Sequence, residues 1–530
     1  MRSITSRLFL FDTFFGAYFM NKIRILFRTK KPEHCGGSGS GLKRCLSAFH
    51  LTLIGIGAII GTGIFVLTGT VAATQTGPAI TISFVIAGIG CSFIALSYAE
   101  LAGSIGGCGS AYGYSYAAFG EWIAWHVGWS ILLGYGVAIA AVANGWSSYF
   151  DNALIAVGVH IPKEFLFGPF SGGIVNLPAA GIILVLMILL IVGAKDSARM
   201  NAIMVGLKLI TIAIFMFIAW GYFDQKNWSP FSPFGWFDMD AAGQPVGILG
   251  GAAKVAFAYI GFDVVASASE EAKNPSRDLP IGILSSLVVA TVLYIVVAGL
   301  LTGIVSYIEL DTPSPISFAL QKIGCAFAGG IVATGALAGL TTVLLVVYFG
   351  LSRILLAIAR DGLLPSFLSR ISEKKGTPIP AIVTLGIAVS ITAGCVSFND
   401  LTELVNIGIL FPFFIVCLGV IGLRIRHPDL KRPFLNPLGS TIPLLGATSC
   451  AAFGYFLSNT AWLYFGVWQV LGAIIYFGYG VRHSKLNPLL RSNYAGREQA
   501  HERKKSAKPI SKKRTVHGRK KVKRSLPWKK

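Results

Sequence analysis

Long apolar stretches dominate this chain, and short segments that carry charge, glycine or proline separate them. A helix needs about 20 mostly apolar residues to cross the hydrocarbon core of a bilayer. Hydrophobic residues make up 54% of the chain and charged residues only 13%, against roughly 25% charged in a soluble domain. We therefore predict an all-α integral membrane protein. Its twelve transmembrane helices are expected over residues 48–73, 78–103, 121–149, 176–194, 198–222, 247–270, 281–305, 327–358, 378–396, 401–423, 441–458 and 461–481.

The positive charges indicate an orientation. Lysine and arginine gather before the first predicted span and after the fourth, sixth, eighth, tenth and twelfth. Cytoplasmic loops of membrane proteins carry such an excess. Both termini are therefore predicted to be cytoplasmic, in a multi-pass protein of the cell membrane. The loop after the second span is the exception, because it contains neither lysine nor arginine.

Composition divides the chain into three parts. Residues 1–45 are predicted to form an N-terminal cytoplasmic segment, in which residues 1–19 could precede a true start at Met20. Residues 46–482 hold the twelve predicted helices. Residues 483–530 form a basic tail that we expect to be disordered, because it has no apolar periodicity. Anionic lipid headgroups are a better partner for such a tail than nucleic acid.

The first predicted span contains a candidate helix break. It reads GIGAIIGTGIF from Gly55 to Phe65 and places Gly61, Thr62 and Gly63 in mid-membrane. Glycine lets the backbone open and approach a ligand, and such breaks are tolerated only where they face protein or a wet cavity. Close helix packing through small residues is an equally good explanation of this segment taken alone.

The sixth span favours the functional interpretation. It reads AFAYIGFDVVASASEEAKNP and places Gly261 and the ionisable Asp263 deep in an apolar run. An intramembrane charge is costly and marks a functional site by default. A glycine-interrupted helix opening each five-span half is typical of transporters built from inverted repeats. Half-helix N-termini suit a carboxylate and freed carbonyls suit an ammonium, so the pattern predicts a site for an α-amino acid.

The fifth span carries Lys208 within VGLKLITIAIF. It lies about 15 Å along the helix from the predicted cytoplasmic end, which is a long reach for a snorkelling side chain. A buried lysine is suited to gain and lose a proton, so we favour proton coupling over snorkelling. No Walker A or nucleophile–base signature occurs, so we predict no ATP hydrolysis, no catalytic residues, no metal and no cofactor.

Several stretches together resemble the amino acid–polyamine–organocation superfamily, and within it the bacterial relatives of the cationic amino acid transporters. They are LTLIGIGAIIGTGIFVLTG (52–69), GSAYGYSYAAFGEWIAW (109–125), AFAYIGFDVVASASEEAKNPSRDLPIGI (256–283), SRILLAIARDGLLP (352–365), NIGILF (406–411) and HPDLKRPF (427–434). The resemblance implies a LeuT-like inverted five-plus-five repeat with broken helices 1 and 6, followed by two extra C-terminal helices. It spans residues 45–485, nearly the whole membrane domain.

The same resemblance implies a substrate site at the two breaks. The N–H groups of Gly61, Thr62 and Gly63 would bind the substrate carboxylate. Phe257 would form an aromatic gate, Asp263 would orient the broken sixth helix, and Lys208 would stand in place of a sodium ion. The α-ammonium would be received by a set of backbone carbonyls, those of Ile59, Phe257, Ala258 and Ile260, with Ile60 and Gly261 in the same breaks.

Two departures from the family pattern bear on the substrate. The third span reads GWSILLGYG, with Ser130 and Gly134 where many relatives carry acids, and Val347 stands at an expected pocket position in the eighth. Both features favour a neutral substrate. We therefore predict proton-coupled symport of neutral amino acids by alternating access. A carrier or exchanger of cationic amino acids or polyamines, or a non-transporting sensor on the same fold, remains the alternative. A small accessory membrane subunit is left open as a partner.

Overall fold

The computed structural model describes most of the membrane domain. The residues that it describes are 26, 28–30, 46–105, 110–156, 158–192, 197–240, 243, 245–269, 272–372 and 375–486. The predicted N-terminal segment lies mostly outside them, and so does nearly all of the basic tail. The chain is almost entirely helical within these ranges; a two-residue antiparallel pair, β1 (Asp238–Met239) with β2 (Pro245–Val246), joins two helices.

The helices of the first half coincide with the first five predicted spans. The first span is divided between an α-helix and a second helical stretch that begins with wide π-helical turns. The elements are α3 (Ala48–Ile59), a π-helix (Gly63–Leu67), α4 (Thr68–Val71), a second π-helix (Ala72–Thr76), a 3-10 turn (Gly77–Ala79), α5 (Ile80–Ser104), α6 (Ser110–Phe119), α7 (Glu121–Ala156), α8 (Leu177–Val192) and α9 (Ser197–Gly221).

The rest of the chain contains a second divided helix. Short 3-10 turns also occur in the connections. The elements are α10 (Gly247–Val255), a 3-10 helix (Ala256–Tyr259), α11 (Val264–Ser267), α12 (Pro275–Ile304), α13 (Pro315–Lys322), α14 (Ala326–Arg360), α15 (Ile379–Cys395), α16 (Phe398–Arg426), α17 (Thr441–Tyr455), α18 (Asn459–Ile475), a π-helix (Tyr476–Gly480) and α19 (Val481–His483).

Eight helical stretches within the described ranges are long and apolar enough to cross a membrane, as expected of a multi-pass membrane protein. They are Gly63–Ser104, Glu121–Ile155, Ala202–Gly221, Gly247–Ala266, Pro275–Ile304, Ala326–Arg360, Leu401–Arg426 and Asn459–His483. Three shorter apolar helices accompany them: Ala48–Ile59, Leu177–Val192 and Ile379–Cys395. The count of twelve spans stays a prediction.

The segment before α7 is a helix of its own, because α6 spans Ser110–Phe119 and ends there. Gly120 follows with φ 98°, a left-handed conformation that glycine adopts without steric cost. The chain turns there, and α7 begins at Glu121.

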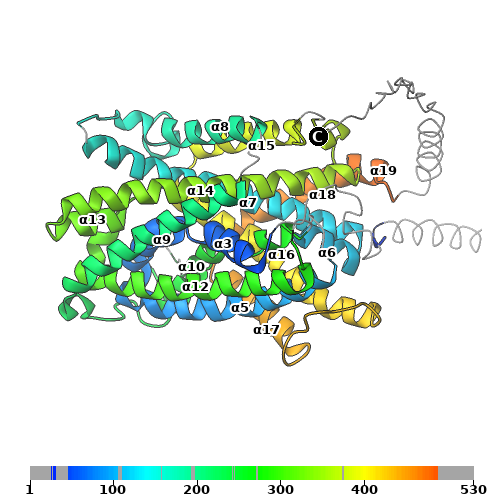
Figure 1. Cartoon of the computed structure of the whole chain (residues 1–530), viewed down its shortest axis with the longest axis horizontal. Coiled ribbons are helices and arrows are strands. Elements are labelled where there is room, and N and C mark those ends of the chain that lie inside the picture. The colour runs from blue at the N-terminus through cyan, green and yellow to red at the C-terminus, as the bar shows by residue number, and fades with distance from the viewer. Residues whose placement is uncertain are drawn as a thin grey trace, which may run out of the picture.

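The long helices lie roughly side by side (Figure 1), with α8 and α15 along one edge and α5 and α17 toward the other. The short α3 lies among α12, α9 and α14 and contacts all three. Glycines allow some of these approaches: a Cβ at Gly134 of α7 would collide with the backbone of Gly408 in α16. Close packing through small residues is what holds helices together in lipid, where no hydrophobic force drives them into contact.

Charged groups join the helices at the end predicted to be cytoplasmic. Glu100 of α5 is buried and accepts two hydrogen bonds from Arg424 of α16, at 2.9 and 2.6 Å. Lys30 forms an ion pair of 2.7 Å with Asp361, just after α14. Glu121 accepts hydroxyl hydrogen bonds from the nearby Tyr116 of α6 and from two side chains far along the chain, Tyr476 and Ser484. Both carboxylates, Glu100 and Glu121, are therefore buried with hydrogen-bond partners.

Candidate functional site

The first helix opens between Ile59 and Gly63. Ile60 leaves the helical conformation, with φ −74° and ψ 101°, and the backbone turns helical again through Thr62. In the helix that restarts at Gly63, the N–H groups of Ile64 and Phe65 donate to the Gly61 carbonyl at 3.2 Å each. The N–H groups at the very start of the helix are the ones that need acceptors from outside it, and the helix dipole makes this end positive. Gly61 faces the Val343 side chain of α14, which would lie 3.1 Å from an added Cβ. The break therefore presents donors toward the centre of the molecule.

The second break lies between the 3-10 helix and α11. The chain passes from α10 through the 3-10 helix to Ile260, which is extended at φ −60° and ψ 132°. Gly261 follows at φ 125°, a region that residues with a Cβ rarely adopt. An added Cβ there would lie 2.8 Å from the Ala58 carbonyl carbon of the first helix. Both the conformation and the lack of space require glycine.

The two breaks lie against each other. Gly261 approaches Ala58, and Gly63 approaches Ala258 so closely that a side chain at Gly63 would overlap it. Tyr294 of α12 connects the same segments: its hydroxyl oxygen lies 2.8 Å from the Ile59 carbonyl oxygen and 2.7 Å from that of Ala258. A phenol carries one proton and so donates to one of these carbonyls at a time.

Lys208 holds the end of α3 from the side. Its ammonium nitrogen donates to the carbonyl oxygens of Gly57, at 3.0 Å, and Ile60, at 2.6 Å, and the residue is fully buried. Its stem passes Gly339 of α14, where an added Cβ would lie 3.0 Å from Cε. The ion pairs found in the described ranges do not include Lys208. The lysine is therefore held by backbone dipoles of the first break.

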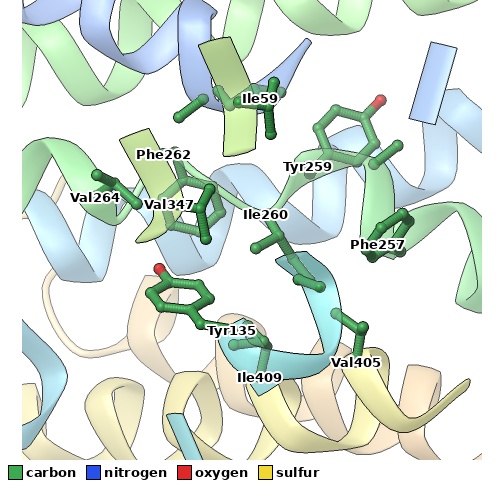
Figure 2. Packing of buried hydrophobic residues seen from close by; sticks show 14 of the residues in the cluster. Ile59, Tyr135, Phe257, Tyr259, Ile260, Phe262, Val264, Val347, Val405 and Ile409 are labelled. Atoms are coloured by element: carbon green, nitrogen blue, oxygen red, sulfur yellow. The ribbon is translucent and has the colours of Figure 1, made fainter. Parts of the chain in front are cut away.

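Asp263 holds the second break. It is buried directly before α11 and accepts a short hydrogen bond from the Tyr135 hydroxyl of α7. Figure 2 shows Tyr135 below Phe262 and Ile260, on the α7 side of the break. The arrangement fits the predicted orienting role of Asp263, because the carboxylate ties the turn of the broken helix to a long, continuous one.

A small central cavity lies where the breaks meet, with a volume of about 30 Å³. Side chains from the two breaks, α7 and α14 leave little space there. Because about 10–15 Å³ holds one water, the cavity has room for only a few small groups. Among the side chains around it, the Thr62 hydroxyl is the polar group and the others are apolar. The lining residues are Ala58, Ile59, Gly61, Thr62, Gly63, Ala138, Ile139, Val142, Phe257, Ala258, Ile260, Val343, Leu344 and Val347. Figure 2 shows Ile59, Ile260 and Val347 converging on this region.

Most of the predicted substrate residues line this cavity. Those that do are Ile59, Gly61, Thr62, Gly63, Phe257, Ala258, Ile260 and Val347. Ile60, Gly261, Asp263 and Lys208 lie behind the lining and shape it through the backbone contacts described above. Their part in substrate binding stays a prediction.

The third-span positions that lack acids lie elsewhere. Ser130 donates to the His126 carbonyl at 2.8 Å and accepts a hydrogen bond from Gln469 of α18. Gly134 packs against Gly408 and Ile409 of α16. Neither lines the central cavity, whose α7 wall is Ala138, Ile139 and Val142. The case for a neutral substrate therefore depends on that apolar wall, and the missing acids add little to it.

Sequence reasoning missed several residues of the site. Tyr294 lies within an apolar run, SSLVVATVLYIVV. Its single hydroxyl group was the feature that could have indicated a contact with the first break. Tyr135 gave the same weak signal. The lining residues of α7 gave none, because alanine, isoleucine and valine are ordinary in any span. Lys254 gave no functional signal by sequence, and it forms an ion pair of 3.9 Å with Glu403 of α16.

Comparison with known proteins identifies the type of chain. The amino acid permease family model matches residues 46–479. The methylthioribose transporter of Bacillus subtilis (strain 168) is 43% identical over 466 residues, covering 87% of this chain and 99% of the relative. The branched-chain amino acid permease BcaP of the same organism is 42% identical over 473 residues, with the same coverage. The vacuolar cationic amino acid transporter 4 of Arabidopsis thaliana is 38% identical over 393 residues, covering 73% and 64%.

Proposed function

Because this chain belongs to the amino acid permease family of the amino acid–polyamine–organocation superfamily, we propose that it is a proton-coupled symporter of neutral amino acids. Family membership confirms the predicted superfamily and makes the protein a transporter rather than an enzyme. Our proposal goes beyond family membership in three points: the substrate, the coupling ion and the twelve-helix inverted repeat. The observation that carries the proposal is the apolar cavity between two facing helix breaks.

Helix packing supports the inverted repeat. The second helix of each proposed half packs against its counterpart, α5 against α12. The third helices, α7 and α14, and the fourth helices, α8 and α15, do the same. The first helix of each half is the broken one, as in transporters whose substrate lies between two repeats near the bilayer midplane. Alternating access would then move one group of helices around the breaks.

The breaks offer complementary groups for a zwitterion. The first-turn N–H groups at Gly61, Thr62 and Gly63 would bind the substrate carboxylate. The carbonyls at Ile59 and Ala258 would accept the ammonium, sharing it with the Tyr294 hydroxyl. Since the cavity holds about 30 Å³, the surrounding side chains must separate to admit an amino acid. Phe257 lines the cavity and would act as the gate that moves.

The cavity wall supports a neutral aliphatic side chain. Ala138, Ile139, Val142 and Val347 surround the space with methyl and methylene groups. A cationic side chain would lose its hydration there without gaining a counter-charge, which is costly in an apolar setting. The name of one relative, a branched-chain amino acid permease at 42% identity, agrees with this preference. Cationic amino acids and polyamines are the less favoured substrates.

Lys208 supports proton coupling. The amine bridges Gly57 and Ile60 at the inner side of the first break, so a change in its protonation alters the hydrogen bonds that hold the break. Loss of the proton removes the charge that these two carbonyls stabilise. The protonated form would favour one conformation of the first helix, and proton release would favour another.

The proposed orientation places both termini and the basic tail in the cytoplasm. The positive-inside distribution supports it. The Glu100–Arg424 and Lys30–Asp361 pairs then lie on the cytoplasmic side and close the inner end. The proposed location is the cell membrane, and the proposed partners are substrate, protons, the lipid bilayer and, still open, a small accessory membrane subunit.

Thermal unfolding of the purified protein with each of the twenty amino acids, from pH 5 to 8, tests the proposal. A ligand that binds the folded state raises the melting temperature by mass action. We expect stabilisation by small neutral amino acids, absent in Gly63→Leu because leucine would overlap Ala258. Stabilisation by arginine and lysine alone would overturn the neutral specificity. Stabilisation by methylthioribose and by no amino acid would assign the substrate named for the relative at 43% identity.

Uptake separates a carrier from a sensor. Protein in liposomes should accumulate a stabilising amino acid against its gradient when the inside is made alkaline. Binding without any uptake or exchange would favour the sensor alternative. Truncation after residue 486 would then be informative, because a sensor that docks a partner through its basic tail loses function whereas a carrier keeps it.

A further inference from the structure

A second and larger cavity opens near the opposite end of α7 from Glu121. Its volume is about 240 Å³, many times the roughly 10–15 Å³ that one water needs. It lies between the last turns of α7, the segment 158–176 that follows, and the segment 306–325 that contains α13. In the proposed orientation this is the outer face. The cavity has room for a small solute without rearrangement.

One carboxylate faces this space. Asp151 of α7 lines the cavity and is partly buried. None of the ion pairs within the described ranges involves Asp151, and its neighbouring titratable group there is His160. The carboxylate is thus available to a positively charged ligand, with one histidine as a local competitor.

The other groups around the cavity suit an ammonium on a short apolar body. The Thr312 hydroxyl is buried without a hydrogen-bond partner in the described structure. Asn152 donates its amide to Ser314, which fixes the floor of the cavity. Leu166 and Phe318 supply apolar walls. A carboxylate, a free hydroxyl and apolar walls together fit an amine with an aliphatic chain better than a bare metal ion, which prefers several oxygen ligands.

The outer cavity and the central one share a wall. Val142 lines the central cavity and Ser147 lines the outer one, and five residues of helix span about 7.5 Å. A chain of side-chain hydrogen bonds follows α7 between them, from Ser147 to Asn176 at 2.7 Å and from Asn176 to Asn144 at 2.8 Å. A solute leaving the outer cavity is therefore one to two helical turns from the helix breaks.

We propose that this outer cavity is a second binding site, which holds the ammonium group of an amino acid on the Asp151 carboxylate before the amino acid reaches the central cavity. The inference rests on the proposed transport function for the identity of the solute. The ammonium chemistry itself rests on the cavity alone. The site would raise the local concentration of substrate at the outer mouth, and so lower KM without changing the maximal rate.

Binding of isoamylamine, the amine that corresponds to leucine without its carboxylate, separates the two sites. Equilibrium dialysis of the full-length protein with labelled isoamylamine should show weak binding that Gly63→Leu leaves unchanged. Asp151→Asn should weaken it roughly threefold to fivefold, which is the upper end of the effect of an exposed ion pair. Asp311→Asn removes an exposed carboxylate of the neighbouring segment that does not line the cavity, and should have no effect.

Transport gives an independent readout. In liposomes, Asp151→Asn should raise the KM for leucine uptake by a similar factor while kcat and the melting temperature stay at wild-type values. Unchanged amine binding and unchanged KM in Asp151→Asn would overturn the outer site. So would equal effects of Asp311→Asn. If the wild type binds isoamylamine through Asp151 but neither binds nor transports any amino acid, the proposed function fails and the ammonium site stands.

Discussion

The two helix breaks look alike in sequence but are held in different ways. The first is held by a cation: Lys208 donates to the carbonyls of Gly57 and Ile60. The second is held by an anion, because Asp263 accepts from Tyr135, and by Gly261, whose left-handed backbone presses against Ala58. Each break is thus tied to a neighbouring helix through one ionisable side chain, but at the second break the packing of Gly261 against Ala58 acts whatever the charge of Asp263. The difference points to the first break as the responsive element and the second as its support.

The largest effect is expected from a substitution in the second break. Gly261→Ala should abolish transport, because alanine at φ 125° is strained and its Cβ would collide with the Ala58 backbone. A strained residue of this kind costs on the order of 1–3 kcal/mol. Uptake and the melting temperature should both fall. Gly206→Ala in α9 is the matched control, because an added Cβ there meets nothing within 4 Å. Wild-type uptake by Gly261→Ala would contradict a fixed second break.

The next largest effect is expected from a substitution of Lys208, which holds the first break. Lys208→Met keeps the apolar stem and removes the group that binds the two carbonyls. We expect loss of proton-driven accumulation, with substrate exchange retained and little dependence of its rate on pH. The loss should be tenfold or more, about 1.4 kcal/mol. Uphill uptake and exchange, each measured from pH 5 to 8, provide the test.

Lys254→Met serves as the control for Lys208→Met. Lys254 is also an intramembrane lysine by sequence, but it pairs with Glu403 outside the central site. This variant should keep proton-driven uptake with a normal pH profile. Normal uphill uptake in Lys208→Met, or equal defects in both variants, would remove proton coupling from Lys208.

A smaller effect is expected from a substitution of Tyr294, whose hydroxyl contacts both breaks. Tyr294→Phe removes the hydroxyl that lies between the Ile59 and Ala258 carbonyls. If these carbonyls receive the substrate ammonium, the KM should rise about tenfold, which corresponds to a hydrogen bond of about 1–1.5 kcal/mol. The KM of an analogue without the amino group should stay constant. A kcat defect with unchanged KM would instead place Tyr294 in the conformational change.

The smallest effect is expected from Tyr135→Phe. It removes the donor to Asp263 but leaves Gly261 and the packing of the second break. Hydrogen bonds between membrane helices contribute about 0.6 kcal/mol on average, so the melting temperature should fall slightly while the pH profile of transport is unchanged. Tyr455→Phe, at a highly exposed position of α17, is the control. A shifted pH profile would show that the second break also responds to protons.

Sequence reasoning located the two helix breaks because the signals for them were local. Glycine and an ionisable residue in an apolar run are conspicuous, so Gly61, Gly63 and Gly261 were found, along with Lys208 and Asp263. The helices also coincide with the predicted spans, because apolar length is read directly from the chain. The separate helix α6 was not foreseen, since a positive φ at Gly120 is one of several conformations that glycine permits.

What the sequence by itself determined is a membrane protein with broken first and sixth helices and a buried lysine, because hydropathy, glycine and charge act on the residues that carry them. Only the tertiary structure decided which groups meet across the breaks: Tyr294 with Ile59 and Ala258, and Lys208 with Ile60. It also turned Ser130 and Gly134 away from the central cavity and placed Asp151 in the outer one. These are contacts between residues far apart along the chain, and helix rotation and packing set them rather than any local preference.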